Sequence, residues 1–251
     1  MSRPGVQLYT VRDVDEPFPT LVERVADLGY EGVEFAYRVG EEDPENVREA
    51  LSAHDLEALG AHVPIDRLEN ETETVVEEYR ALGCDRLVVP HLGEEHFVDR
   101  EAVEETADRL SALGNRLRDH DASLLYHNHA HEFAEIEGES ALERLVEESD
   151  ASLGIELDVG LATWAGADPL PFLAAHADRI PLVHLTDSIP GDPDGQHVEL
   201  GDGEVDLDGV LSAARKAEVE WLVFERGTSD EQLRTLQRGA SVLERLLGED
   251  R

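Results

Sequence analysis

Cysteine and lysine are almost absent from this sequence. Its 251 residues include one cysteine, Cys84, and one lysine, Lys216, and the other 20 basic residues are all arginine. A lone cysteine cannot form an internal disulfide, and the residues around Cys84 have neither the spacing of a metal site nor that of a catalytic thiol. The sequence therefore excludes a small scaffold held together by disulfides, and we expect Cys84 to be buried.

Positive charge is also scarce. The chain carries 21 Lys and Arg against 58 Asp and Glu, a formal net charge of −37. A protein that binds nucleic acid needs Lys and Arg clustered on one face to neutralise phosphates, and the sequence has no such cluster, so we expect no nucleic-acid partner. Because 41% of the residues are hydrophobic, the chain can still form one large core, which argues against an acidic disordered tail.

Long apolar segments are missing as well. No uninterrupted apolar run approaches the ~20 residues that span a bilayer. The N-terminus lacks the basic and apolar regions of a signal peptide. We therefore expect a soluble, cytoplasmic protein with no membrane partner, and the sequence leaves open whether it forms a homo-oligomer.

Short apolar segments rich in β-branched residues recur along the whole chain, with amphipathic segments between them. Each interval is long enough for one strand, one helix and two short loops. In the first interval Leu21, Val22 and Val25 share one helical face, and Gly29 follows where a C-terminal cap is expected. The eight candidate strands begin 27 to 39 residues apart, at Gly5, Gly32, Leu59, Arg86, Ser123, Leu153, Leu182 and Trp221.

This alternation predicts a parallel sheet with right-handed crossovers. Eight units in about 250 residues match a closed (β/α)₈ TIM barrel in number and size. The rival is an open, doubly wound sheet, but a Rossmann arrangement needs a glycine-rich turn after the first strand, and residues 9–17 contain no glycine. We therefore predict an α/β protein with a (β/α)₈ TIM barrel that forms a single domain over residues 1–251.

The C-terminal ends of the predicted strands are unusually polar, and this is where a TIM barrel carries its chemistry. The sixth strand ends with Glu156 and Asp158, the seventh contains His184, and Glu225 follows the eighth. The fifth strand continues into YHNHAHE at 126–132, which contains three histidines and a glutamate. Because these ends meet at one rim, the sequence predicts a set of converging oxygen and nitrogen ligands.

Carboxylates buried close together would raise one another's pKa values and repel, whereas a divalent cation makes such a cluster favourable. We therefore predict a metal site at this rim. The donor types suit Mn²⁺, Mg²⁺, Co²⁺ or Zn²⁺. Glu156 lies two residues before Asp158 and is either a partner that orients a ligand or a member of an interior ion pair. Gln7 in the first strand either packs the barrel or faces the pocket.

Several motifs have the order and spacing of a known family. They are VQLYTVRD at 6–13, YHNH at 126–129 with Glu132-Phe133, LDV at 157–159, AGADP at 165–169, VHLTD at 183–187 and GDGEVD at 201–206. Because these motifs occur in the same order and spacing, nearly the whole chain resembles the sugar phosphate isomerase/epimerase family of xylose isomerase-like TIM barrels. That family also includes inosose dehydratases, ketose 3-epimerases and endonuclease IV.

The resemblance implies a divalent metal held by one acidic or imidazole group from each of strands five to eight. Asp158, His184 and Glu225 match three of these positions. Relatives place a glutamate at the end of strand five, where this chain has His127, and Glu132 lies a few residues further on. We rank Glu132 slightly above His127 as the fourth ligand, in which case His127 lines the substrate pocket.

The resemblance further implies a metal-dependent isomerase or epimerase that moves a proton on a sugar or sugar phosphate through a metal-stabilised enediolate. Glu225 is the expected ligand and acid/base, with Glu132 or His127 opposite it. His62, His127, His129 and Arg226 are the expected substrate contacts. The alternatives are an inosose dehydratase-like or keto-sugar lyase and, less favoured, a non-catalytic barrel that binds a sugar or cation. The net charge argues against an AP endonuclease.

The excess of acid over lysine also predicts that the protein comes from an extreme halophile. Repulsion between surface carboxylates extends over a Debye length of about 30 Å at 0.01 M salt but only about 3 Å at 1 M. We therefore expect the free energy of unfolding to rise between 0.1 and 3 M KCl, as measured by denaturant titration at each salt concentration. Equal stability across the series would contradict a halophilic origin.

Overall fold

The protein forms a closed barrel of eight parallel strands in a computed structural model that describes residues 2–36 and 39–248. The strand order is β1-β10-β9-β8-β5-β4-β3-β2, which confirms the predicted fold class. Six strands begin at the predicted residue, and β1 and β3 begin two residues earlier. The strands are β1 (Arg3–Gln7), β2 (Gly32–Phe35), β3 (Glu57–His62), β4 (Arg86–Val89), β5 (Ser123–His127), β8 (Leu153–Asp158), β9 (Leu182–Leu185) and β10 (Trp221–Phe224).

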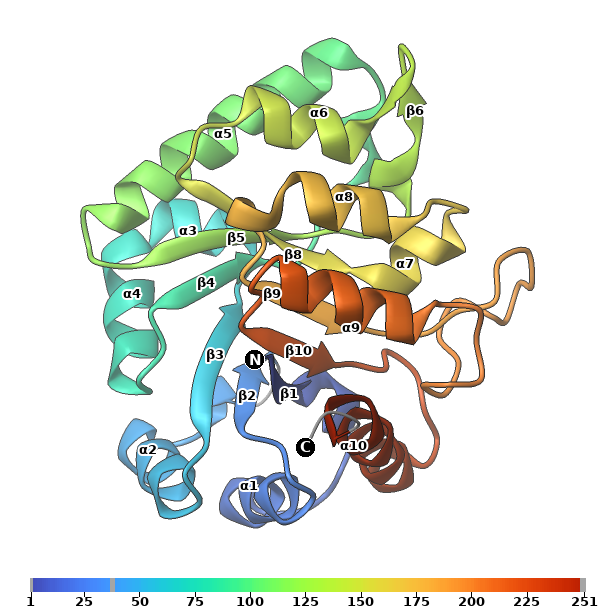
Figure 1. The fold of residues 1–251 in the computed structure, drawn as a ribbon. Coiled ribbons are helices and arrows are strands. Elements are labelled where there is room, and N and C mark those ends of the chain that lie inside the picture. The colour runs from blue at the N-terminus through green and yellow to red at the C-terminus, as the bar shows by residue number, and fades with distance from the viewer. Residues whose placement is uncertain (1, 37–38, 249–251) are drawn as a thin grey trace.

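Helices surround the barrel and bury their apolar faces against its strands (Figure 1). Gly29 has a φ of 88° just after α1, as the predicted cap requires. No helix in the described part of the chain is long and apolar enough to cross a membrane. The helices are α1 (Phe18–Asp27), α2 (Pro44–Ala53), α3 (Ile65–Asn70), α4 (Thr72–Ala81), α5 (Arg100–Arg118), α6 (Ala141–Glu148), α7 (Val159–Trp164), α8 (Pro169–Ala175), α9 (Leu207–Lys216) and α10 (Gln232–Gly248).

Some short elements differ from the predicted pattern. The apolar segment GVQLYT at 5–10 predicts a first strand that includes Tyr9, but the strand ends at Gln7. The Gln7 side-chain oxygen accepts the Tyr9 N–H at the start of the 3₁₀-helix η1 (Leu8–Val11). Helices α3 and α7 have six residues each, too few for a periodic pattern to reveal. Between β5 and α6 lie another 3₁₀-helix and a small hairpin, η4 (His131–Phe133), β6 (Glu135–Ile136) and β7 (Glu139–Ser140).

Two apolar regions hold the barrel together. The larger one lies between the strands and the helices and includes Cys84, which is buried as expected. The smaller one comes from alternate strand residues that do not join this outer core, and it comprises Leu59, Val88, Leu125, Leu182, Trp221 and Val223. Since these residues lie before the polar strand ends in sequence, the apolar filling of the barrel leaves its C-terminal end free for polar side chains.

Leu59 occupies space that two glycines leave open. A Cβ atom added at Gly5 or Gly32 would lie 2.4 Å from a methyl carbon of Leu59. Nothing lies within 4 Å of a Cβ added at Gly40, a position in the 3₁₀-helix η2 (Val39–Glu41).

We expect Gly32→Ala to lower the free energy of unfolding by about 1–3 kcal/mol through overpacking, and Gly40→Ala to change it little. Leu59→Ala should cost about 2–5 kcal/mol by leaving a cavity. The double variant Gly32→Ala/Leu59→Ala should cost less than the sum of the single changes, because the added methyl group enters that cavity. Strict additivity in urea titrations would contradict this packing.

Candidate metal centre

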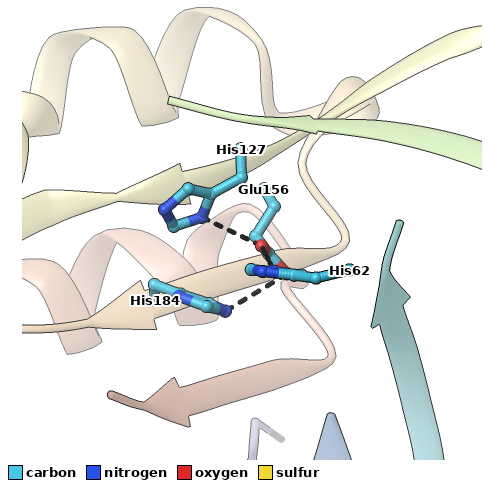
Figure 2. A group of neighbouring side chains, drawn as sticks. All are labelled: His62, His127, Glu156 and His184. Atoms are coloured by element: carbon cyan, nitrogen blue, oxygen red, sulfur yellow. Dashed lines mark hydrogen bonds and ion pairs between the residues drawn. The ribbon is translucent and has the colours of Figure 1, made fainter. Parts of the chain in front are cut away.

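Polar side chains from seven barrel strands gather at the C-terminal end of the barrel. Two overlapping sets of four have ligand atoms that all lie within 4.8 Å of one another. We call His127, Asp158, His184 and Glu225 the outer group, because Asp158 is the last residue of β8 and Glu225 directly follows β10. We call His62, His127, Glu156 and His184 the inner group (Figure 2). We call these residues together with Gln7 and Glu34 the polar layer, which comprises Gln7, Glu34, His62, His127, Glu156, Asp158, His184 and Glu225.

The outer group is held in place by local backbone structure. Asp158 ends β8 and caps α7, because its Oδ1 accepts the Leu161 N–H at 2.7 Å. The same oxygen accepts the Thr186 hydroxyl at 2.6 Å. Glu225 directly follows β10, and its Oε2 lies 2.9 Å from Nδ1 of His184. His184 is fully buried, whereas the Glu225 side chain is 13% exposed. Glu225 can therefore be reached from solvent at the C-terminal end of the barrel, which we call the mouth.

The inner group is built around Glu156. Its Oε2 lies 2.9 Å from both His62 Nε2 and His127 Nδ1. Its Oε1 lies 3.2 Å from His184 Nε2. Figure 2 shows the three rings converging on this carboxylate from β3, β5 and β9. Glu34 of β2 adjoins the group, with its Oε2 2.7 Å from His184 Nε2.

Burial and close charges shift the pKa values of these groups in opposite directions. Burial alone would lower the pKa of His184, but Glu156 and Glu34 outweigh it and hold that pKa well above its ordinary value. Burial would raise the pKa of Glu225, but the hydrogen bond from His184 and the nearby histidine charges lower it to about 2. The pKa of Glu34 is raised by burial and by Glu156. These directions favour a protonated His184 between ionised carboxylates.

Glu132 does not join either group. It is fully buried, its Oε1 accepts the Tyr126 hydroxyl, and its Oε2 accepts the His129 backbone N–H at 2.9 Å. From the turn at η4 the carboxylate faces Tyr126 of β5 and the backbone that follows this strand. The structure thus brings His127, and not Glu132, next to the other three predicted ligands.

The remaining predicted contacts lie around the mouth. His62 belongs to the inner group. The His129 ring packs against His127, with ring centroids 5.3 Å apart, and burial and neighbouring histidines lower its pKa to about 3, so it is neutral. Arg226 forms an ion pair with Glu199, and its backbone N–H donates to Thr10 Oγ1 at 3.1 Å. Arg226 therefore joins the segments that follow β9 and β10.

The long segment between β9 and α9 is held by Asp187. Its carboxylate accepts the backbone N–H groups of Ser188, Gly201, Gly203 and Val205 at 2.8–3.2 Å. A Cβ at Gly203 would lie 2.0 Å from Asp187 Oδ1, so this turn requires glycine. The GDGEVD motif is therefore the part of the chain that folds around a buried aspartate at the rim.

The sequence analysis did not identify Glu34 as a site residue, and it left the role of Gln7 open. Glu34 was not singled out, although a lone glutamate in the otherwise apolar strand GVEF is a usable signal. Gln7 was weighed only between packing and the pocket. Its amide Nε2 donates to Glu34 Oε2 at 2.8 Å, and both side chains are fully buried.

Comparison with known proteins agrees with this architecture. The family model described as xylose isomerase-like TIM barrel matches residues 22–246, so the chain belongs to that family. An inosose dehydratase of Geobacillus kaustophilus is 29% identical over 190 residues, and that match spans 66% of this chain and 61% of the relative.

Solved structures share the fold at low identity. A sugar phosphate isomerase/epimerase from Parabacteroides distasonis has a TM-score of 0.79 at 18% identity, covering 97% of this chain and 94% of the other. The IOLI protein, solved with a bound zinc atom, has a TM-score of 0.78 at 15% identity and covers 98% of both chains.

The protonated state of His184 predicts that cation binding releases protons. A metal ligand must offer a lone pair, so His184 has to lose the proton on Nδ1. We expect Zn²⁺ titrations at pH 7, run calorimetrically in buffers of different ionisation enthalpy, to show a release of about one proton or more per chain. The apparent affinity should rise with pH. A binding enthalpy that is independent of the buffer would contradict this protonation state.

Proposed function

We propose that the outer group binds one divalent cation and that the protein is a metal-dependent enzyme acting on a sugar or sugar phosphate. The observation that carries this proposal is the convergence of four ligand residues from β5, β8, β9 and the end of β10 within 4.8 Å. Their mixed nitrogen and oxygen donors suit Mn²⁺, Mg²⁺, Co²⁺ or Zn²⁺. The zinc atom in the IOLI structure lends support to a metal in this fold.

We assign the fourth ligand to His127 in place of Glu132. The two oxygens of Glu132 already accept hydrogen bonds from Tyr126 and His129, so its supported role is to hold the backbone beside the mouth. The same bonds argue against Glu132 as an acid/base. His127 belongs to the ligand set itself, and one of its nitrogens is still free of Glu156.

A divalent cation in this position would polarise a substrate carbonyl and make the neighbouring C–H more acidic. Glu225 is the group we assign to remove that proton, because its carboxylate can accept a proton and its side chain is partly exposed. His129 is neutral and can both donate to and accept from substrate hydroxyls. Returning the proton to the opposite face or to the adjacent carbon gives an epimer or an isomer.

A dehydratase is the second candidate. The same proton removal followed by loss of a β-hydroxyl yields a dehydrated product, and the Geobacillus kaustophilus relative is an inosose dehydratase.

Several expectations remain predictions from the sequence. They are the single-domain organisation, the cytoplasmic location, the halophilic origin, the lack of a nucleic-acid partner and the open oligomeric state.

The decisive experiment incubates ketoses and inososes with the Mn²⁺-loaded protein in D₂O. We expect deuterium at a carbon next to the carbonyl, and loss of about 10²-fold or more of that exchange in Glu225→Gln. The matched control is Glu220→Gln, an exposed carboxylate just before the other end of β10. A new carbonyl-conjugated absorbance with loss of water would identify the dehydratase. Cation binding without any exchange would leave a non-catalytic binding protein and overturn the proposal.

A further inference from the structure

Beneath the outer group lie two buried carboxylates that the proposed reaction does not use. Glu34 and Glu156 are both fully buried, and each lies against a histidine that also belongs to the outer group. Burying a carboxylate costs free energy unless hydrogen bonds and nearby charges compensate it. Two such residues at this position therefore need a physical explanation.

The two ring nitrogens of His184 face different carboxylates. Nε2 lies 2.7 Å from Glu34 Oε2, and Nδ1 lies 2.9 Å from Glu225 Oε2. When a cation occupies Nδ1, the imidazole can keep a proton only on Nε2. Glu34 then accepts a hydrogen bond from the Nε2–H group. This bond fixes the ring so that the lone pair of His184 Nδ1 faces the outer group.

His127 is held with its proton on the other ring nitrogen, Nδ1. Its Nδ1 lies 2.9 Å from Glu156 Oε2, so a proton on Nδ1 leaves the lone pair on Nε2. His62 Nε2 lies at the same distance from that oxygen and restrains the carboxylate from the other side. The two carboxylates thus select different tautomers in the two histidines.

A hydrogen-bond chain behind Glu34 sets its orientation. The Tyr9 backbone N–H can only donate, so the Gln7 oxygen must accept it, at 3.1 Å. The Gln7 NH₂ group is then turned towards Glu34 Oε2 and donates to it. A Cβ added at Gly60 would lie 2.9 Å from Glu34 Oε1, so glycine makes room for this carboxylate.

We infer that Glu34 and Glu156 are positioning residues that hold His184 with its proton on Nε2 and His127 with its proton on Nδ1, so that both lone pairs face a cation in the outer group. This inference rests on the proposed function, because it needs a cation there. Carboxylates that orient histidine ligands in this way typically contribute about 10- to 100-fold to metal affinity.

The test compares Zn²⁺ affinities, measured by competition with a chromophoric chelator. We expect Glu34→Leu and Glu156→Leu to bind Zn²⁺ about 10- to 100-fold more weakly than the parent chain. Glu34→Gln and Glu156→Gln keep an oxygen acceptor and should lose less. The control is Glu143→Gln, which removes a carboxylate 2.7 Å from His176 Nε2 in the helical layer. It should leave Zn²⁺ affinity unchanged.

A second readout does not depend on affinity. In ¹⁵N-histidine spectra of the Zn²⁺-loaded parent chain, we expect the His184 proton on Nε2 and the His127 proton on Nδ1. In the Glu→Gln variants we expect these two N–H protons to move upfield, because a neutral amide oxygen replaces the carboxylate that accepts each hydrogen bond. If the leucine variants fail to fold, as judged by circular dichroism, the glutamine variants and the spectrum of the parent chain decide the question.

Each remaining outcome has a clear reading. Unchanged Zn²⁺ affinity in folded leucine variants, or the opposite tautomers in the parent chain, overturns the positioning role alone. Two Zn²⁺ ions per chain, falling to one in Glu156→Gln, means that the inner group binds an ion itself and also overturns it. A parent chain that binds no Zn²⁺ overturns both this inference and the proposed function. Normal positioning without proton exchange in D₂O overturns only the proposed enzyme activity.

Discussion

Four carboxylates and three histidines share the C-terminal end of the barrel, and the free energy of burying their charges governs this end of the molecule. Glu34, Glu156 and His184 are completely inaccessible to water. Charges in such an environment persist only when other charges and hydrogen bonds replace the lost solvent. A proton on His184, whose pKa Glu156 and Glu34 raise, can supply part of that compensation. A divalent cation can supply it instead, so protons and metal compete for one electrostatic role.

The barrel offsets the free-energy cost of these buried charges with hydrophobic burial elsewhere in the fold. Leu59, Trp221 and their apolar neighbours fill the interior before the polar strand ends, and the helices cover the outside. Most of the hydrophobic stabilisation therefore comes from regions that the polar layer does not disturb. The C-terminal end of the barrel can keep a network of ionisable groups because the apolar interior and the surrounding helices hold its strands in register.

The sequence was sufficient to predict the barrel, most strand starts and three of the four residues in the outer group. Asp158, His184 and Glu225 lie on or directly after strands, where the parallel register determines their position. The choice between His127 and Glu132 depended on η4, a three-residue turn that directs Glu132 towards Tyr126. A turn of that length leaves no periodic signal, so the sequence alone could not decide between the two residues.

Glu34 was missed for a different reason. Whether a strand residue points into a barrel or towards the helices depends on the stagger between neighbouring strands, and the β2–β3 register shifts between Val33 and Glu34. A four-residue strand in which every position is buried gives no alternation from which to read that direction. Interior polar partners such as Gln7 and Glu34 therefore become visible only with the three-dimensional register, whereas ligands at the strand ends are visible in the sequence.

The surface charge and the polar layer act on cations over different distances. A net charge of −37 attracts cations of every kind at low ionic strength, but a Debye length of about 3 Å at 1 M salt reduces that attraction to direct neighbours. The outer group would instead hold a cation in direct contact with its ligand atoms, which all lie within 4.8 Å of one another. Screening would thus weaken the general attraction while leaving short-range coordination largely intact. Any selectivity for a divalent cation would then have to come from the buried donor set, whose geometry depends on the residues that orient it.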